Sequence, residues 1–274
     1  MPNNNMLGKR IVSGLIIIVV ALALVILGGW VFTVGVAAIL SMAAWEFATL
    51  FEKGGYAPAK IILTAGTFLT ALVAKSGDNL YIAAIFGLLI LVITLYHVLT
   101  FSRHQNSAAF DLAASLAGAA FITFTGNYLI QLRFLPEGLF WLLQCILPAG
   151  ISDVGAFFIG SLFGHHKIAP DLSPNKSWEG YFGGMFTSVL LGYGTGLFLS
   201  SYSATFSGAR GILIGLVVGI LSPLGDFAKS IFKRQFGLKN TGNLIPGHGG
   251  VLDRIDTWLI AGVVSYFMIR FFFI

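Results

Sequence analysis

Residues 222–256 read SPLGDFAKSIFKRQFGLKNTGNLIPGHGGVLDRID, and an apolar segment lies on either side of them. The stretch combines carboxylates, cations, one histidine and a glycine-rich turn: Asp226, Asp253, Asp256, Lys229, Lys233, Arg234, Lys239, Arg254, His248 and Pro246–Gly250. Carboxylate oxygens bind hard cations, whereas Lys, Arg and the backbone N–H groups of a turn bind phosphate oxygens. This density of charge between apolar segments predicts a site for a metal ion and phosphate groups.

The rest of the chain is strongly apolar. Of its 274 residues, 57% are hydrophobic and 10% are charged, whereas about 25% of residues are charged in an ordinary soluble domain. We therefore expect an all-α polytopic membrane protein with about nine transmembrane helices, because no segment shows the alternation of a membrane β-barrel. The expected spans are Ile11–Leu27, Trp30–Leu50, Ile61–Ala74, Leu80–Thr100, Leu112–Ile130, Leu139–Gly160, Tyr181–Ser200, Gly211–Ser230 and Leu252–Phe273.

Positive charge is distributed unevenly between the two sides of these spans. The chain has 16 Lys and Arg residues, and four of them (Lys75, Arg133, Arg210 and Arg270) fall on one side, which leaves 12 on the other. Cytoplasmic loops are the richer in Lys and Arg, so we expect the polar site to open to the cytoplasmic side. The net charge of +5 is explained by these loops, and we do not expect nucleic acid as a partner.

A second polar stretch runs from Asp153 to Gly180 and reads DVGAFFIGSLFGHHKIAPDLSPNKSWEG. Asp153 falls inside the sixth expected span, where a carboxylate costs roughly 2.5–3.5 kcal/mol and normally faces a polar cavity or a partner. It is a candidate metal ligand, with a structural ion pair or a helix–helix hydrogen bond as the alternative. The loop that follows offers short polar side chains and a lysine before a helix start: Ser173, Asn175, Lys176, Ser177 and Glu179. The pair His165-His166 is either a solvated loop edge or a phosphate contact.

The carboxylates of the first stretch also have helical spacing. Asp253 and Asp256 are three residues apart at the start of the ninth expected span, and so lie on one helical face. Carboxylates at a helix N-terminus can simply stabilise the helix dipole, which explains at most one of the two. Glu46, near the end of the second span, is interpreted as a paired or snorkelling carboxylate rather than as a catalyst.

The run S-x-F-K-R-x4-K-N-x-G-x2-I-P-x-H-G-G-V-x-D-R-I-D, from Ser230 to Asp256, resembles the signature of the phosphatidate cytidylyltransferases, the CDP-diacylglycerol synthases. The second stretch is similar to that family's D-x-x-A-[YF] and S-P-x-K-[ST]-x-E-G elements. One position departs from the pattern, because the family usually has Lys-Asp where this chain has Lys239-Asn240.

The resemblance implies a nucleotidyltransferase that converts CTP and phosphatidic acid to CDP-diacylglycerol and pyrophosphate. It implies metal-dependent attack of the lipid phosphate on the α-phosphate of CTP, with Mg²⁺ as the cofactor and a second cation as an option. The implied catalytic residues are Asp226, Asp253, Asp256, His248, Lys233 and Arg234. The implied substrate-binding residues are Ser173, Asn175, Lys176, Ser177, Glu179, Lys239, Gly249, Gly250 and Arg254, and the implied metal ligands are Asp226, Asp253, Asp256 and Asp153. The alternative role for Arg254 is an ion pair with these carboxylates.

The same resemblance sets expectations for organisation and location. Residues 1–108 are expected to form N-terminal transmembrane helices, and residues 109–274 a transmembrane catalytic region that carries both motifs. The expected partners are the two substrates, the lipid bilayer and, as one option, a second copy of the chain in a homodimer. The expected location is the bacterial inner (cell) membrane, with the active site facing the cytoplasm.

Two other functions stay open. A CTP-dependent lipid kinase, such as a polyprenol kinase, would transfer the γ-phosphate and release CDP, so the released product distinguishes it from a cytidylyltransferase. A transporter would also place carboxylates inside membrane spans, but transporters often show an internal repeat. Neither of the two quoted stretches has a duplicate elsewhere in the chain.

Overall fold

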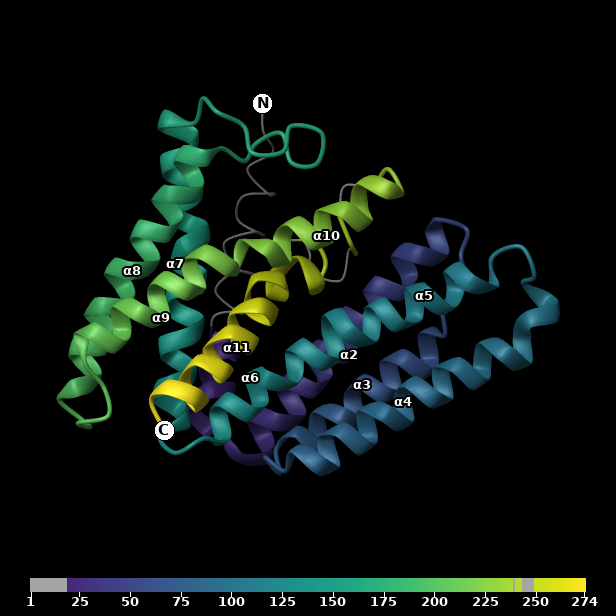
Figure 1. Ribbon diagram of the computed structural model, residues 1–274, viewed down its shortest axis with the longest axis horizontal. Coiled ribbons are helices and arrows are strands. Elements are labelled where there is room, and N and C mark those ends of the chain that lie inside the picture. The colour runs from purple at the N-terminus through teal and green to yellow at the C-terminus, as the bar shows by residue number, and fades with distance from the viewer. Residues whose placement is uncertain (1–18, 239, 243–248) are drawn as a thin grey trace. The chain divides into compact units, whose positions relative to one another are not determined.

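The computed structural model describes residues 19–238, 240–242 and 249–274, and these residues are largely helical (Figure 1). The helices are α2 (Gly29–Lys53), α3 (Lys60–Ala74), α4 (Asn79–Thr100), η1 (Phe101–Arg103), α5 (Ala108–Gly118), the π-helix η2 (Ala119–Phe124), α6 (Thr125–Phe134), α7 (Gly138–Phe163), α8 (Trp178–Ser200), α9 (Gly208–Leu221), α10 (Pro223–Gln235) and α11 (Leu252–Phe272). Residues 19–27 are helical as well. Within the described ranges there is no β-strand, so the expected all-α class is confirmed.

Among the described residues, seven helical segments are long and apolar enough to cross a membrane: Gly29–Lys53, Asn79–Arg103, Ala108–Phe134, Gly138–Phe163, Trp178–Ser200, Gly208–Gln235 and Leu252–Phe272. Each overlaps one of the nine expected spans. The third expected span is α3, whose 15 residues rise only about 22 Å, less than the roughly 30 Å of a hydrocarbon core. The first expected span lies mostly outside the described residues. The count of nine therefore stays a prediction.

The described helices fall into two compact units. The first is formed by Met1–Gln131 and Phe232–Ile255, and the second by Leu132–Ile231 and Asp256–Ile274. The chain crosses from the second unit to the first within α10 and returns within α11. The expected division of the sequence near residue 108 stays a prediction.

In the first unit, aromatic rings fasten the end of α10 to α2. The Phe232 ring lies 5.0 Å from the Phe47 ring at an interplanar angle of 81°, and the Phe236 ring lies 5.1 Å from the Phe51 ring at 71°. Such edge-to-face pairs are favourable beyond the apolar area that they bury. They hold the end of α10 against α2 in the first unit.

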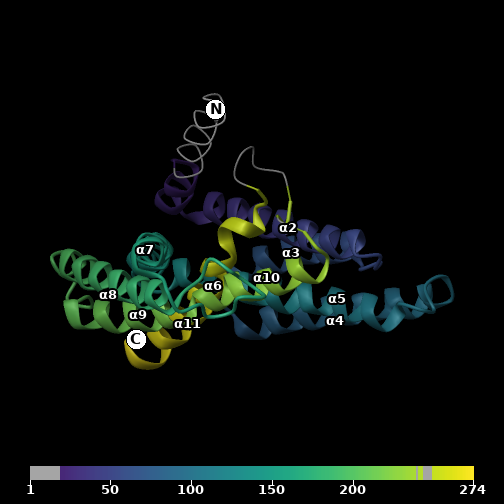
Figure 2. The ribbon, with the colours of Figure 1, turned by 90° about the horizontal axis from the view of Figure 1, so that it is seen from above.

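In the second unit, small residues bring α7, α8 and α9 together, and Figures 1 and 2 both show these helices side by side. A Cβ placed on Gly211 would lie 2.0 Å from the Gly192 carbonyl oxygen. Ser188 Oγ donates to the Gly215 carbonyl at 2.8 Å, and Gln144 Nε2 donates to the Gly192 carbonyl at 2.8 Å. Small residues allow this close approach in helices that lipid surrounds. The three helices thus pack closely together, and the loop between α7 and α8 extends from this packed group.

The eighth expected span is divided and extended in the structure. Pro223 lacks an N–H group, so the helical ladder loses a bond there, and the segment separates into α9 and α10. Helix α10 continues to Gln235 rather than ending near Ser230. Lys233 and Arg234, which follow the end of the expected span at Ser230, therefore lie in the last turn of this helix and not in a loop.

Gly225 is the point of closest approach between α10 and α11. A Cβ at this position would lie 2.0 Å from the Asp256 carbonyl oxygen, which cannot move without disturbing the first turn of α11. We predict that Gly225→Ala lowers stability by about 1–3 kcal/mol, the usual cost of overpacking. The measurement is the thermal midpoint of the detergent-solubilised protein.

The matched control is Gly194→Ala in α8, where a Cβ would meet nothing within 4 Å. This variant should unfold at or slightly above the wild-type temperature, because alanine favours a helix. Equal midpoints for the two variants would show that α10 and α11 are not in close contact at Gly225.

Candidate active site

Lys229 lies at the centre of the polar cluster in the second unit. Its side chain is 6% exposed, and its Nζ lies 2.8 Å from Asp226 Oδ1 and 2.6 Å from Asp256 Oδ2. Asp226 and Lys229 are three residues apart in α10, so both project from one face of that helix. Asp256 comes from the first turns of α11. One buried ammonium thus holds carboxylates from two helices.

A second cation reaches the same cluster from the loop between α7 and α8. Lys176 Nζ lies 2.5 Å from Asp226 Oδ2, and both side chains are a little over a quarter exposed. Asp226 is therefore paired on both of its oxygens. Removing charges from water costs several kcal/mol per ion unless they are well paired, and this arrangement of two carboxylates and two ammonium groups meets that requirement. The paired groups on the exposed side, Lys176 and Asp226, are the ones that a ligand could reach.

Asp153 lies within α7, as the sequence predicts, and its side chain is exposed. Thr257 Oγ1 donates to Asp153 Oδ2 at 3.3 Å, which links α7 to α11. This contact is a helix–helix hydrogen bond of the kind that the sequence offered as the alternative to a metal role. The hydrogen bond leaves the other carboxylate oxygen available, and the role in metal binding stays a prediction.

Asp253 belongs to the first unit, where it organises the ends of the loop between α10 and α11. Its Oδ2 accepts hydrogen bonds from Thr241 N at 3.0 Å, from Thr241 Oγ1 at 2.9 Å and from Gly250 N at 3.2 Å. Its Oδ1 lies 3.3 Å from Lys233 Nζ. Asp253 is therefore a fixed carboxylate with a lysine beside it, and Lys233 is the cation that the structure brings to it.

The loop between α7 and α8 is held by its own backbone and by two of the predicted site residues. Lys167 and Ser177 form an isolated bridge, and Trp178 N donates to the His166 carbonyl at 2.9 Å. Ser177 is 2% exposed, and its hydroxyl accepts from Gly180 N at 3.2 Å as the N-cap of α8. Ser177 thus supports the loop that presents Lys176.

Glu179 closes the same loop from the first turn of α8. Its Oε1 lies 2.6 Å from His166 Nδ1, and His166 N donates to the carboxylate at 3.2 Å. The sequence left two roles open for His165-His166, a solvated loop edge or a phosphate contact. In the structure His166 pairs with the Glu179 carboxylate. The nucleotide-binding role proposed for Ser177 and Glu179 stays a prediction, because both side chains already make these local bonds.

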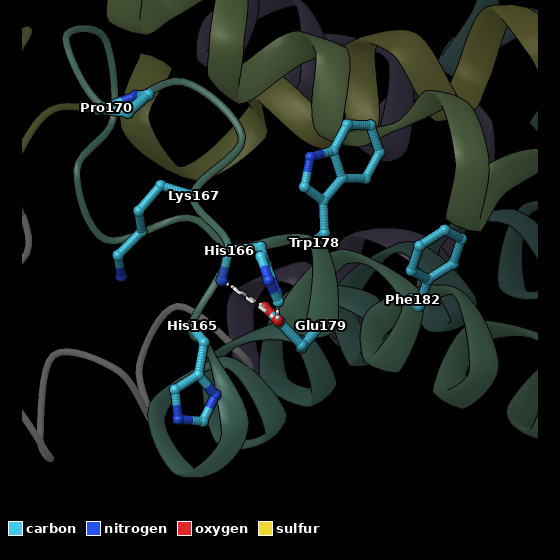
Figure 3. Close-up of a pocket in the computed structure, with 7 residues that line it drawn as sticks. All are labelled: His165, His166, Lys167, Pro170, Trp178, Glu179 and Phe182. Carbon is cyan, nitrogen blue, oxygen red and sulfur yellow. Dashed lines mark hydrogen bonds and ion pairs between the residues drawn. The ribbon is translucent and has the colours of Figure 1, made fainter.

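A pocket of about 820 Å³ opens beside this loop (Figure 3). Its lining residues are His165, His166, Lys167, Pro170, Trp178, Glu179 and Phe182. Figure 3 shows His166 and Glu179 directed toward each other, with the Trp178 and Phe182 rings set apart from the two histidines. The Trp178 and Phe182 rings lie 6.1 Å apart at 29°, and both are about half exposed. The pocket thus combines aromatic faces with imidazole and ammonium groups.

The other predicted site residues are placed as follows. Ser173 and Asn175 belong to the turns just before Lys176, with Asn175 exposed. Arg234 and Arg254 are exposed at the surface. Gly249 has a φ of 86°, which favours glycine, and a Cβ on Gly250 would lie 2.3 Å from Thr241 Oγ1. His248 and Lys239 lie outside the described residues.

The donor chemistry fits a divalent cation in part. Among the described residues no three His, Cys, Asp or Glu side chains are grouped so as to hold a metal ion. Mg²⁺, however, usually binds through one or two carboxylates together with substrate phosphates and water. Asp226 and Asp256 direct oxygens at a single point, which Lys229 Nζ occupies. Because that ammonium fills the point between the two carboxylates, the arrangement fits Mg²⁺ only at the more exposed Asp226, with substrate phosphates and water as the remaining ligands.

Sequence reasoning missed three residues of these clusters. Lys229 is one of the cations of the first polar stretch without an expected role, although its i, i+3 spacing from Asp226 is a usable signal for an ion pair. Thr241 and Thr257 each donate to a site carboxylate. Nothing in the sequence distinguishes these two threonines from any others in the chain.

Comparison with known proteins agrees with the motifs. The model of the cytidylyltransferase family matches residues 8–272. A phosphatidate cytidylyltransferase from Synechocystis is 31% identical over 291 aligned positions, covering 95% of this chain and 96% of that protein. One from Bacillus subtilis is 31% identical and covers 96% and 98%, and one from Staphylococcus epidermidis is 31% identical and covers 73% and 74%.

The position of Lys229 generates a prediction about stability. Lys229→Met would leave the buried Asp256 without its cation, and breaking a buried pair from one side costs about 3–5 kcal/mol. We expect a clear fall in the thermal midpoint of the purified protein, measured by intrinsic fluorescence in detergent.

Lys60→Met is the matched control, because Lys60 forms an ion pair of 2.7 Å with the more exposed Glu52. Lys60 Nζ also lies 4.0 Å from the Trp45 ring centroid; near the surface an ion pair and a cation–π contact contribute about 0–1 kcal/mol each, so this variant should lose much less stability than Lys229→Met. If the two variants unfold together, Lys229 does not hold Asp226 and Asp256.

Proposed function

We propose that this chain, which belongs to the cytidylyltransferase family, makes CDP-diacylglycerol and pyrophosphate from CTP and phosphatidic acid. The observation that carries the proposal is similarity to two phosphatidate cytidylyltransferases along 95% and 96% of the chain. The seven apolar helices and the bacterial relatives make it an integral membrane protein. A membrane-embedded enzyme suits a reaction in which one substrate is a lipid.

The reaction requires two anions to meet. An oxygen of the lipid phosphate attacks the α-phosphorus of CTP, the bond from that phosphorus to the bridging oxygen of the β-phosphate breaks, and pyrophosphate leaves. A phosphate monoester is largely ionised at neutral pH, so no base is needed to remove a proton from the nucleophile. Catalysis then consists mainly of positioning and charge neutralisation.

Lys176 is the residue that we assign to phosphate binding in the second unit. Its ammonium is fixed on Asp226 but remains more than a quarter exposed, so a phosphate oxygen can approach it. Lys229 is almost fully buried, and its role is to hold Asp226 and Asp256 in place. The accessible lysine thus meets the substrate, while the buried one supports the carboxylates.

Asp226, whose side chain is more than a quarter exposed, is the residue that we assign to Mg²⁺ in the second unit, and Asp256, buried against Lys229, remains a candidate ligand. Bound there, the ion would neutralise phosphate charge and stabilise the charge that develops on the departing pyrophosphate. Asp153 and Asp253 remain candidate ligands for this ion or for a second cation.

In the first unit, the residues around Asp253 suit phosphate binding. Lys233 lies beside the carboxylate, and Arg234 is exposed in the same turn of α10. With Lys239, Arg254 and the Gly249-Gly250 backbone, these groups are our candidates for contacts to phosphate oxygens. His248 is assigned a hydrogen bond to substrate rather than proton abstraction. The cation-rich side of the helices is proposed to face the cytoplasm, from the inner membrane of a bacterium.

The labelling pattern of the product tests the reaction. The purified protein is given phosphatidic acid with CTP labelled at either the α- or the γ-phosphate. We expect the α-label to enter the lipid phase, with one pyrophosphate released for each lipid formed. Transfer of the γ-label to lipid with release of CDP would instead establish a kinase, and no transfer of either label would contradict both activities.

Asp226→Asn tests the assigned carboxylate in the same assay. Loss of one preorganised electrostatic group typically costs about 10²–10³ in kcat, and we expect a fall of that size. Glu52→Gln removes an exposed carboxylate on α2 and should keep wild-type turnover. Near-wild-type turnover of Asp226→Asn at saturating Mg²⁺ would remove Asp226 from the site.

The pocket beside the loop is our candidate for the nucleoside part of CTP. Stacking of a base on an aromatic side chain is worth about 1–3 kcal/mol, and the Trp178 ring is exposed in the pocket wall. We expect Trp178→Ala to raise the KM for CTP about 5- to 100-fold with little change in kcat.

Phe186→Ala is the matched control, because Phe186 is exposed on α8 but does not line the pocket. It should leave the KM for CTP unchanged. An unchanged KM for CTP in Trp178→Ala would place the nucleoside elsewhere.

A further inference from the structure

Glu46 is a carboxylate in α2 that is 3% exposed. Its Oε2 accepts a hydrogen bond from Leu252 N at 3.0 Å, across 206 positions of the sequence. Leu252 is the first residue of α11. The first N–H groups of a helix have no partner within the helix, and they carry partial positive charge. Glu46 therefore caps α11 from a different helix.

The same carboxylate is tied to Asp253 through Thr241. Thr241 Oγ1 lies 3.4 Å from Glu46 Oε2 and 2.9 Å from Asp253 Oδ2. A hydroxyl has one proton to donate, and the shorter distance assigns that proton mainly to Asp253. Thr241 N also donates to Asp253, at 3.0 Å. Thr241 thus lies between the two carboxylates and fixes their separation.

Two described glycines of the segment between α10 and α11 lie close to Glu46. A Cβ on Gly250 would lie 2.4 Å from Glu46 Oε2, and a Cβ on Gly242 would lie 2.4 Å from Glu46 Oε1. Both distances are far below van der Waals contact, so neither position accepts a larger residue without movement of the carboxylate. Gly242 and Gly250 therefore both lie close against the Glu46 carboxylate.

We propose that Glu46 is a positioning residue for the cytidylyl-transfer reaction. By capping α11 and limiting the position of Thr241, it fixes the Asp253 carboxylate beside Lys233. It does not touch substrate. The inference deepens the proposed function and rests on it, because the consequence of a misplaced Asp253 is measured as turnover.

The test compares Glu46→Gln with Glu52→Gln in the labelled-CTP assay. The amide keeps the size of the side chain, but one of its two ends becomes a donor with no acceptor in place of the carboxylate. We expect kcat of Glu46→Gln to fall about 10- to 100-fold, with the KM for CTP within about threefold of wild type and with a lowered thermal midpoint that stays above the assay temperature, since a buried donor without an acceptor costs stability. Glu52 lies on the same helix and pairs with Lys60 at the surface, so its variant should match wild type.

Thr241→Val gives a second arm, because valine keeps the shape and removes the shared hydroxyl. If Glu46 acts through Thr241 and Asp253, the double variant should have about the same kcat as the less active of the two single variants. The effects of residues that act through one another do not add. Three results would each overturn the inference. The kcat of the double variant could fall by the product of the two single losses, or the kcat of Glu46→Gln could stay within twofold of wild type. The third is a loss of activity that only parallels a loss of folded protein. Absence of turnover in the wild-type protein would instead overturn the proposed function.

Discussion

The buried Lys229 ammonium, held between Asp226 and Asp256, is the interaction on which the polar part of the second unit depends. It lets two carboxylates from separate helices sit close together in apolar surroundings, where either alone would be costly. It also requires α10 and α11 to touch, and Gly225 makes that contact possible. The outer lysine, Lys176, then completes the pairing of Asp226 from a different loop. Lys229 thus balances the charge of the buried carboxylates, whereas Lys176 is the lysine that an anionic substrate can reach.

Glycine has a comparable role in both units. In the second unit it lets α8 approach α9 backbone to backbone, as at Gly211. In the first unit, Gly242 and Gly250 let the chain fold against the Glu46 carboxylate. In each case a side chain at the glycine would collide with the group beside it, a carbonyl oxygen in the second unit and a carboxylate in the first.

Local features of the structure could be predicted from the sequence, and long-range ones could not. Apolar runs are local, so the start of α11 at Leu252 and the position of Asp153 inside α7 follow from the sequence. The extension of α10 past Ser230 does not follow from the apolar pattern, because the pattern ends where the charged residues Lys233 and Arg234 begin, while the helix continues to Gln235. Ser177 and Glu179 have polar side chains at a helix start, where capping and ligand binding look alike in sequence. The bond from Glu46 to Leu252 joins residues 206 positions apart, and no spacing rule reaches that far.

The central claim is that the Asp226–Lys229–Asp256 cluster exists for the reaction and not for the fold. The direct measurement is made on the triple variant Asp226→Asn, Lys229→Met and Asp256→Asn, which removes all three charges together. Replacing a buried ion cluster by neutral groups of similar size is often neutral or stabilising. The account predicts a thermal midpoint equal to or above that of the wild-type protein, together with complete loss of CDP-diacylglycerol formation. A triple variant that still forms CDP-diacylglycerol at the wild-type rate would contradict it.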